Sequence, residues 1–291
     1  MLLLEEVLVP LPEMSVARLE PFPDTDDLGA VLVFLDKQRK LAALNRKAGD
    51  EAQQSGDRAQ AAKAWQAASQ QNLHALAGAR RFAGFGQLFD QQGNPVRGRN
   101  YPLEGKEADF ARIYCDTLGR QGGLYRRLGD LDNAHAYYAL GARIEARSGD
   151  LAFENSYNTL NAISTLIERG LASASPLGQD WPGLRAEIVA ARDMVKSQIT
   201  DGKRGNDAWA KADLAMAIML SNDVVAANDE IPACYAFYAG KADVDDIETT
   251  LRILKSVMEK LGEIGDPVAA LIRDGIATLR DAALKAGKRV D

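Results

Sequence analysis

The sequence predicts an all-α fold in which antiparallel helical hairpins stack into a superhelix. Residues 118–150 place small side chains and aromatic side chains where two crossing helices need them: Gly122 lies on one helix, Tyr138 on the next, and Gly129-Asp130 at the turn between them. The stretch that begins at Gly56 repeats the same offsets. Two helices joined by a short turn approach to about 8–10 Å only where the crossing positions lack bulk. The repeated spacing therefore favours stacked hairpins.

Composition places the chain among soluble globular proteins. Of its 291 residues, 46% are hydrophobic and 26% are charged, which excludes a disordered chain. We expect no membrane partner, because no stretch reaches the roughly 18 apolar residues of a span. The start of the chain lacks a basic region and is interrupted by Glu5 and Glu6, so it is not typical of a signal peptide. Cys115 and Cys234 form no CxxC pair, and we expect a reduced protein in the cytoplasm.

The net charge of −6 is unevenly distributed, since residues 74–147 carry eleven Lys and Arg against eight Asp and Glu. A partner attracted by charge would therefore be acidic and would bind this middle region. The alternative is that these arginines only solvate helix surfaces. The candidate side chains are Arg80, Arg81, Arg97, Arg99, Arg120, Arg126 and Arg127.

The first two segments are predicted to be an arm and a hairpin. Residues 1–27 form an extended N-terminal arm, because four prolines interrupt any helix there. The arm could pack along the helices, pair with another chain, or be the end of a longer protein. Residues 28–83 form the first helical hairpin, with its turn at Ser55-Gly56-Asp57 and an Ala-rich second helix that contains Trp65.

A Gly- and Pro-rich loop insertion is predicted over residues 84–106. Five glycines and two prolines break any long helix in this stretch. A loop of this length inside a compact array is uncommon unless it has a function or is disordered. Its GFG sequence is not a dinucleotide fingerprint, because no strand precedes it.

Further hairpins are predicted over residues 107–241. A helix spans 152–170, followed by a loop at 171–183 in which Asp180 caps the next helix, which runs to about Ile199. The last of these hairpins has Asn222 at its turn instead of glycine. Pro232 should kink its second helix or limit its length.

Residues 242–291 form a pair of C-terminal helices that cap the array. Asp243 or Asp245 begins the first helix and Asp266-Pro267 the second. Both helices carry apolar stripes of helical period, which are Ile247, Leu251, Leu254, Met258 and Leu261 on one and Val268, Ile272, Ile276 and Leu279 on the other.

With these residues in place, the chain resembles the tetratricopeptide repeat (TPR) proteins. More narrowly, it is similar to the bacterial TPR type that resembles the MAP3K TRAFs-binding domain. The likeness covers residues 110–262 and depends on the hairpin at 122–144, the Asn-Ala pair within 156–162, and Trp209-Ala210 at the start of an Ala-rich hairpin. It implies a scaffold, sensor or regulatory module in signalling that binds a peptide or protein in a concave groove.

In a TPR-like array the first helix of each hairpin lines that groove. The resemblance therefore implies that Arg46, Lys47, Asp50 and Gln53 face inward in the first hairpin, with Asp116 and Gly123 in the second. Arginine offers a forked donor to carboxylates, and asparagine pairs with peptide backbone. For Asn158 and Asn161 the alternative is a role in the start of a helix. The groove candidates are Arg120, Arg126, Arg127, Tyr157, Asn158 and Asn161.

We predict no catalytic residues, no metal ligands and no cofactor. His74 and His135 each lie alone in a predicted helix, and no phosphate-binding loop or nucleophile elbow occurs. Cys115 would be reactive only if neighbouring arginines lowered the pKa of its thiol. Two alternatives to the scaffold stay open. One is a self-assembling homo-oligomeric subunit, and the other is an enzyme or a nucleic-acid or nucleotide binder that uses the basic centre.

Overall fold

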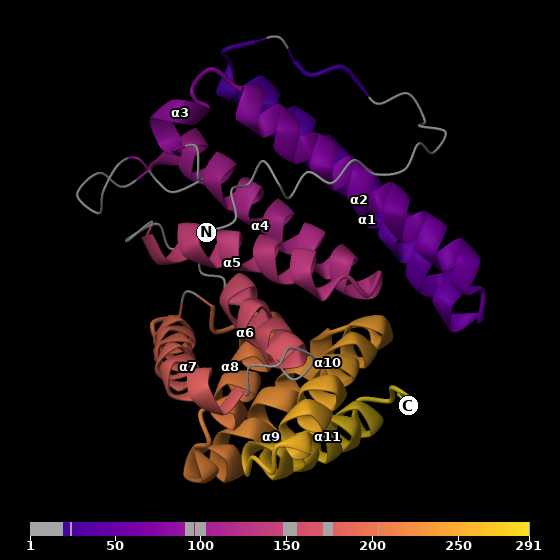
Figure 1. The fold of residues 1–291 in the computed structure, drawn as a ribbon, viewed down its shortest axis with the longest axis vertical. Coiled ribbons are helices and arrows are strands. Elements are labelled where there is room, and N and C mark those ends of the chain that lie inside the picture. Colours follow the sequence, from indigo (N-terminus) through magenta and orange to yellow (C-terminus); the bar gives the residue numbers. More distant parts are fainter. Residues whose placement is uncertain are drawn as a thin grey trace. The chain divides into compact units, whose positions relative to one another are not determined.

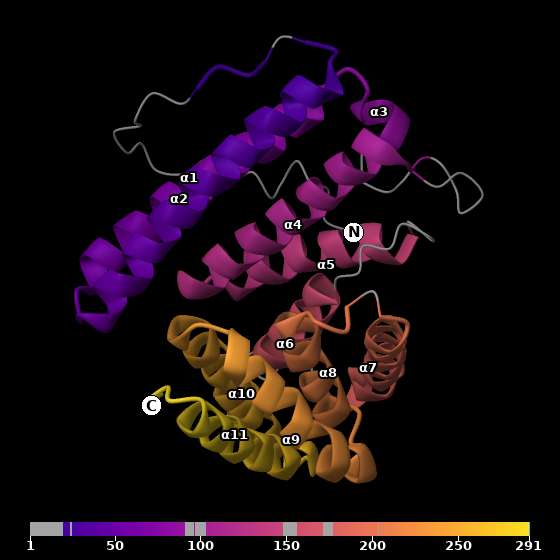
Figure 2. The same cartoon turned by 180° about the vertical axis from the view of Figure 1, so that it is seen from behind.

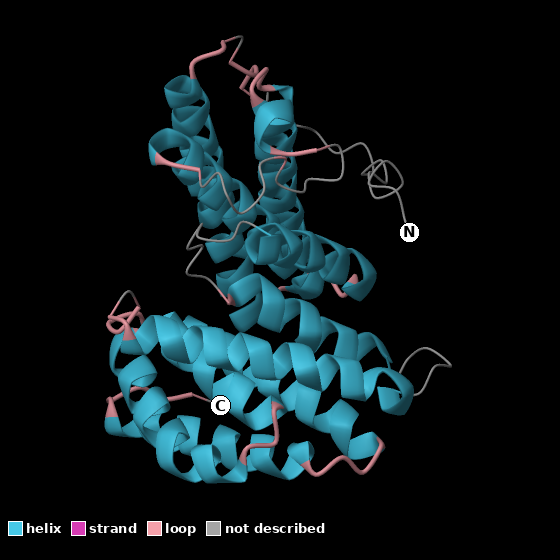
Figure 3. Ribbon diagram, turned by 90° about the vertical axis from the view of Figure 1, so that its left-hand side faces the viewer, coloured by secondary structure: helices cyan, strands magenta, loops and turns pink. Residues whose placement is uncertain are grey.

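The computed structural model describes residues 20–23, 25–90, 96, 103–147, 156–170, 177–202 and 204–290, with residues 146, 147, 170 and 177–183 described by backbone alone. Every regular element in these ranges is a helix (Figure 3), which confirms the all-α class. The helices are α1 (Leu28–Gln54), α2 (Arg58–Arg81), α3 (Phe85–Leu88), α4 (Gly105–Arg127), α5 (Leu131–Arg147), α6 (Tyr157–Gly170), α7 (Leu177–Thr200), α8 (Ala208–Leu220), α9 (Val224–Lys241), α10 (Val244–Glu263) and α11 (Val268–Lys285).

Several sequence predictions fall outside the described residues. They include most of the N-terminal arm, residues 1–19 and 24, and most of the predicted insertion, residues 91–95 and 97–102. Arg97 and Arg99 of the basic set belong to the latter range. Of the insertion, residues 85–88 form the short helix α3.

The chain divides into two compact units, Met1–Phe153 and Glu154–Asp291. The division lies inside the segment 107–241 that the sequence predicts as one series of hairpins. α1 to α5 belong to the first unit and α6 to α11 to the second, and each unit is described by itself.

Two long hairpins make up the first unit, α1 with α2 and α4 with α5 (Figure 1). α4 packs against both helices of the preceding hairpin. The close approach of helices depends on glycine, because a Cβ added to Gly122 would lie 2.9 Å from the Tyr138 ring and one added to Gly49 would lie 2.4 Å from Trp65. The crossing predicted from small and aromatic residues is therefore present in both hairpins.

One type of turn recurs in four hairpins. The first helix ends in a left-handed residue, with φ of 84° at Gly56, 80° at Gly129, 57° at Asn222 and 70° at Gly265. Glycine adopts this conformation without a steric cost, and asparagine tolerates it better than most residues do. Asn222 therefore takes the place of glycine in the α8–α9 hairpin without changing the type of turn.

An aspartate follows each of these left-handed residues and begins the next helix. Its backbone N–H donates to a carbonyl of the helix that has just ended, and its carboxylate accepts a backbone N–H of the helix that follows. The carboxylate contacts are Asp57 with Gln60 at 2.9 Å, Asp130 with Asn133 at 3.1 Å, Asp223 with Ala226 at 3.0 Å and Asp266 with Val268 at 2.9 Å.

In the second unit α8 to α11 pack together around one apolar core (Figure 2). The stripes predicted for the last two helices are buried there, with Met258 packed partly buried against them. One local prediction is wrong, because α7 begins at Leu177, so Asp180 lies within the helix and is not its N-cap. Pro232 does not limit the length of α9, which continues through it to Lys241 and buries Tyr235 and Tyr238 in the core beyond the proline.

Candidate functional site

The facing sides of α1 and α4 in the first unit carry charged side chains that join the two helices. We call this set the α1–α4 seam. Residues seven apart on a helix return to nearly the same face after two turns, and this spacing aligns Arg39 with Arg46 and Arg120 with Arg127. The seam consists of Asp36, Arg39, Arg46 and Asp50 from α1 and Asp116, Arg120 and Arg127 from α4.

At one end of the seam, Asp116 holds two arginines. It accepts a hydrogen bond from Arg39 across the helices and one from Arg120 Nε at 2.9 Å on its own helix. Burial lowers the pKa of the Arg39 guanidinium, and the Asp116 carboxylate opposes that shift. Asp36 lies nearby, and its pKa is held below the usual range chiefly by the hydrogen bond from Lys40.

At the other end, three donor side chains contact the Asp50 carboxylate. Its Oδ1 accepts Trp65 Nε1 at 2.9 Å and Arg127 Nε at 2.9 Å, and its Oδ2 lies 3.5 Å from an Arg46 nitrogen. The Arg127 side chain is only 10% exposed, and it also donates to the Gly123 carbonyl at 3.3 Å. The ion pair between Asp50 and Arg127 therefore holds α1 against α4.

The three arginines of α4 that were predicted as groove residues therefore differ in exposure and in the partners that they contact. Arg120 is on the seam with 43% of its side chain exposed. Arg126 is partly buried and lies about 100° around the helix from Arg127. Arg127 was predicted to line an open groove, but Asp50 and the neighbouring helix enclose its charge. Of the three, Arg120 is the one that presents its charge to solvent along the seam.

The other three candidates are on α6, in the second unit. Asn158 is fully buried and Asn161 is 8% exposed. The Asn161 amide donates to the Tyr157 carbonyl at 2.8 Å, one turn earlier in the helix. This contact fits the alternative role at a helix start. Tyr157 is partly exposed at the first position of the helix.

The sequence prediction missed Arg39, although it placed Arg46 on the inward face. Arg39 lies seven residues earlier on the same helix, so the helical period alone could have found it. No sequence signal showed which arginines would be neutralised, because their aspartate partners Asp116 and Asp50 lie 77 residues away in the chain.

A second polar cluster lies where Ser156, the loop before α8, and α8 itself meet. The Ser156 hydroxyl donates to Asp213, and Arg204 lies against Ser156 at 3.5 Å and against Asp207 at 2.7 Å. Burial raises the pKa of Asp213 to about 6, while the Ser156 hydrogen bond and Arg204 oppose the shift. The carboxyl therefore changes charge near neutral pH, and no motif in the sequence predicted it.

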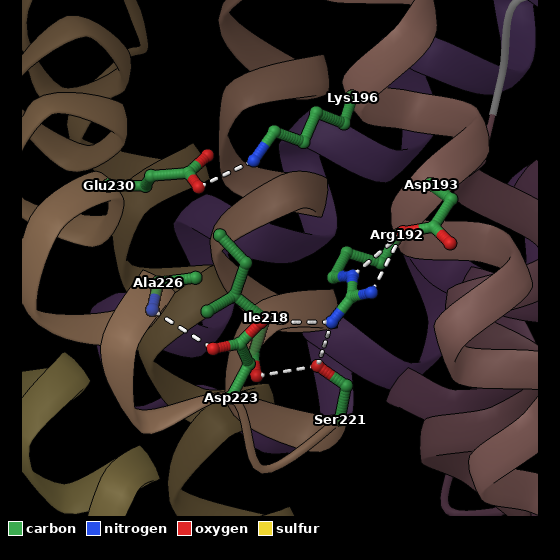
Figure 4. A network of polar contacts seen from close by, with 8 residues as sticks. All are labelled: Arg192, Asp193, Lys196, Ile218, Ser221, Asp223, Ala226 and Glu230. Carbon is green, nitrogen blue, oxygen red and sulfur yellow. Dashed lines mark hydrogen bonds and ion pairs between the residues drawn. The ribbon is translucent and has the colours of Figure 1, made fainter.

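A third cluster fastens α7 to the turn between α8 and α9 (Figure 4). Arg192 points at that turn and donates to Asp223 at 3.1 Å, the residue that also caps α9. Lys196 pairs with Glu230 at 2.6 Å one turn further along. The contacts drawn in Figure 4 join Arg192 to Asp223 and Lys196 to Glu230, so the cluster stabilises the packing of α7 on these elements.

Other reactive groups are shielded. Cys115 is 2% exposed, and burial raises the pKa of its thiol well above its ordinary value, so the condition for a reactive thiol is not met. Trp65, Tyr125 and Tyr138 are buried, so these aromatic side chains serve the packing of the helices. Across the described ranges no three His, Cys, Asp or Glu side chains are grouped to hold a metal ion. None of the helices in those ranges is both long enough and apolar enough to cross a membrane.

Comparison with known proteins adds no assignment. A scan against protein-family models found no match for this chain, and a search of curated proteins found none either.

Proposed function

We propose that this protein is a non-enzymatic interaction module that binds an acidic segment of a peptide or protein along the α1–α4 seam. The observation that carries the proposal is the composition of the seam, in which four arginines face three aspartates. Arginine donates through five N–H groups in a rigid fork and cannot lose its charge at physiological pH. The seam therefore keeps donors and positive charge beyond what its own aspartates neutralise.

The exposed members decide where a partner would bind. Arg46 and Arg120 are each 43% exposed, while Arg127 and Arg39 are held against carboxylates deeper between the helices. A partner carboxylate would replace water on the two outer guanidinium groups, and the inner pairs would keep those groups in place. Charge attraction of this kind raises the association rate and depends on ionic strength.

The proposal includes a TPR-like arrangement for the first unit. Two features support it. Both hairpins pair a glycine on the first helix with an aromatic ring on the second, and α4 packs against both helices of the preceding hairpin. In this arrangement α1 and α4 are the first helices of successive hairpins, which are the helices that line the ligand-binding face in TPR-like arrays.

The test measures binding of fluorescently labelled peptides by anisotropy, with a panel of acidic sequences and their Glu→Gln counterparts. The variant Arg46→Glu/Arg120→Glu should lower affinity for acidic peptides at least tenfold. The matched control is Arg143→Glu, which alters an exposed arginine of α5, a helix that contributes no residue to the seam. It should leave binding unchanged.

Three results would contradict the proposal. The Gln peptides could bind as well as the acidic ones, the control could lose as much affinity as the seam variant, or no acidic peptide could bind the wild-type protein. Tighter binding of single-stranded nucleic acid, with a steep loss of affinity on adding salt, would instead favour the nucleic-acid alternative.

A further inference from the structure

A second surface of the first unit already holds a peptide, namely the chain's own residues 20–23. This segment precedes α1, and each of its contacts reported below is with α1 or α2. Pro21 and Pro23 restrict the backbone on both sides of Phe22, so little conformational entropy is lost when the segment docks. We call the surface beneath it the Phe22 slot, formed by Phe34, Lys37 and Gln38 of α1 and His74, Gly78 and Arg81 of α2.

Aromatic and cationic groups of the slot contact the Phe22 ring, which is partly exposed. The ring centroid lies 4.5 Å from that of His74 and 5.9 Å from that of Phe34, and the Arg81 guanidinium lies 4.4 Å from it. Gly78 forms the floor, because a Cβ there would lie 2.8 Å from Phe22 and 2.6 Å from Phe34. Aromatic contacts and a cation–π contact both stabilise a ring placed in this way.

Two residues earlier, Glu20 is held by its side chain and by its backbone. Its carboxylate lies 2.8 Å from Lys37 Nζ and accepts Gln38 Nε2 at 3.3 Å. Its carbonyl oxygen lies 2.6 Å from His74 Nε2, which donates to it. Gln38 is buried, with 1% of its surface exposed. The slot therefore contacts an acidic side chain, a backbone carbonyl and an aromatic ring that lie at a fixed spacing in the segment.

We propose that the Phe22 slot is a peptide-recognition site for segments that carry an acidic residue two positions before a phenylalanine, and that residues 20–23 occupy it in cis and keep it closed. The site is separate from the α1–α4 seam, and it uses none of the seam residues. A tethered ligand competes at an effective concentration of about millimolar, so a peptide in trans binds only when the cis segment is removed or weakened.

The test uses the full-length chain and a fluorescently labelled peptide spanning residues 18–26. In the variant Glu20→Ala/Phe22→Ala the slot should be empty, and the peptide should bind at least tenfold more tightly than to the wild-type protein. A peptide with Phe22→Ala should bind the emptied variant no more tightly than it binds the wild-type protein. Circular dichroism establishes that the variant retains its helices.

A charge exchange separates recognition from a general loss of structure. Adding Lys37→Glu to the emptied protein should abolish binding of the natural peptide, and a peptide with Glu20→Lys should restore it. Arg120→Glu in the emptied protein should leave peptide binding unchanged, so failure of the seam proposal and failure of this one are distinguishable.

The proposal is overturned if the folded, emptied variant does not bind the peptide. It is equally overturned if the wild-type protein binds the peptide as tightly as the emptied variant does, because the cis segment then does not close the slot. If emptying the slot also tightens binding of the Phe22→Ala peptide, the ring is not recognised, and this result too contradicts the proposal.

Discussion

Arginines on the same helix face of this protein differ in how exposed their side chains are and in which residues they contact. Arg120 and Arg127 are seven residues apart on one face of α4, yet one is 43% exposed and the other 10%. Asp50 makes the difference, because it accepts Arg127 together with Trp65 between the helices. An ion pair enclosed in this way contributes to packing, while Arg120 keeps part of its guanidinium open to solvent.

Replacement of Arg127 by alanine should destabilise the first unit by roughly 1–3 kcal/mol, because it leaves Asp50 partly buried with one cation fewer. Arg120→Ala is the matched change on the same helix face, and it should cost less than about 1 kcal/mol. Urea unfolding followed by circular dichroism measures both. Equal stability of the two variants would show that the Asp50 pair does not contribute to packing.

Asp213 should make stability depend on pH near neutrality. Because burial raises the pKa of its carboxyl to about 6, the folded chain holds a proton between about pH 4 and pH 6 that the unfolded chain has released. The contribution of this group to stability therefore falls as the pH rises through that window. The Asp213→Asn variant carries no charge at this position. Its free energy of unfolding should therefore exceed that of the wild-type protein by on the order of 2 kcal/mol at pH 7.5.

The same comparison at pH 4.5 should give a smaller gain, because wild-type Asp213 is then largely protonated when folded. Asp281→Asn is the control, since that carboxylate is 58% exposed and pairs only with Lys285 on its own helix. This surface substitution should change stability by less than about 0.5 kcal/mol. A gain for Asp213→Asn that is the same at both pH values would contradict the raised pKa.

At the scale of elements, local sequence rules explain how each hairpin is made. A left-handed residue followed by a capping aspartate ends one helix and begins the next at four places, and Asn222 fills the role of glycine in one of them. The pairing of Gly122 with Tyr138 then sets how closely two helices approach. These signals are local or recur at fixed spacing, so the sequence alone could predict them.

Gly122→Ala should therefore destabilise the protein by about 1–3 kcal/mol, because the added methyl group would overlap the Tyr138 ring. Gly240→Ala is a matched change in α9, where nothing lies within 4 Å of the new Cβ. It should stabilise by about 0.5–1 kcal/mol, since alanine favours helix over glycine. Thermal unfolding checks the pair, and two shifts of the same sign would refute the predicted crossing.

At the scale of the whole molecule, the chain consists of two units, each with its own packed helices. The sequence predicts one continuous series of hairpins over residues 107–241, and the division between the units lies inside that range. Periodicity shows which face of a helix is apolar, but it does not show which other helix covers that face. The core of the second unit draws on residues from Ile163 to Ala283.

A fragment spanning residues 154–291 should therefore fold alone, with a helical circular dichroism spectrum and cooperative thermal unfolding. A fragment spanning 107–241 should not, because it lacks α1 and α2, on which α4 packs, and α10 and α11, which complete the second core. Cooperative unfolding of the second fragment but not the first would show that the sequence-based boundaries are the physical ones.

The sequence by itself determined the all-α class, the hairpin turns, the crossing glycines and the apolar stripes of the last two helices, because each depends on residues close in the chain or at a fixed helical period. Only the tertiary structure decided which arginines remain exposed, that Asp213 is buried beside Ser156, and that Phe22 docks over Gly78. These facts depend on residues that are about 50 to 80 positions apart, and folding alone brings such residues into contact.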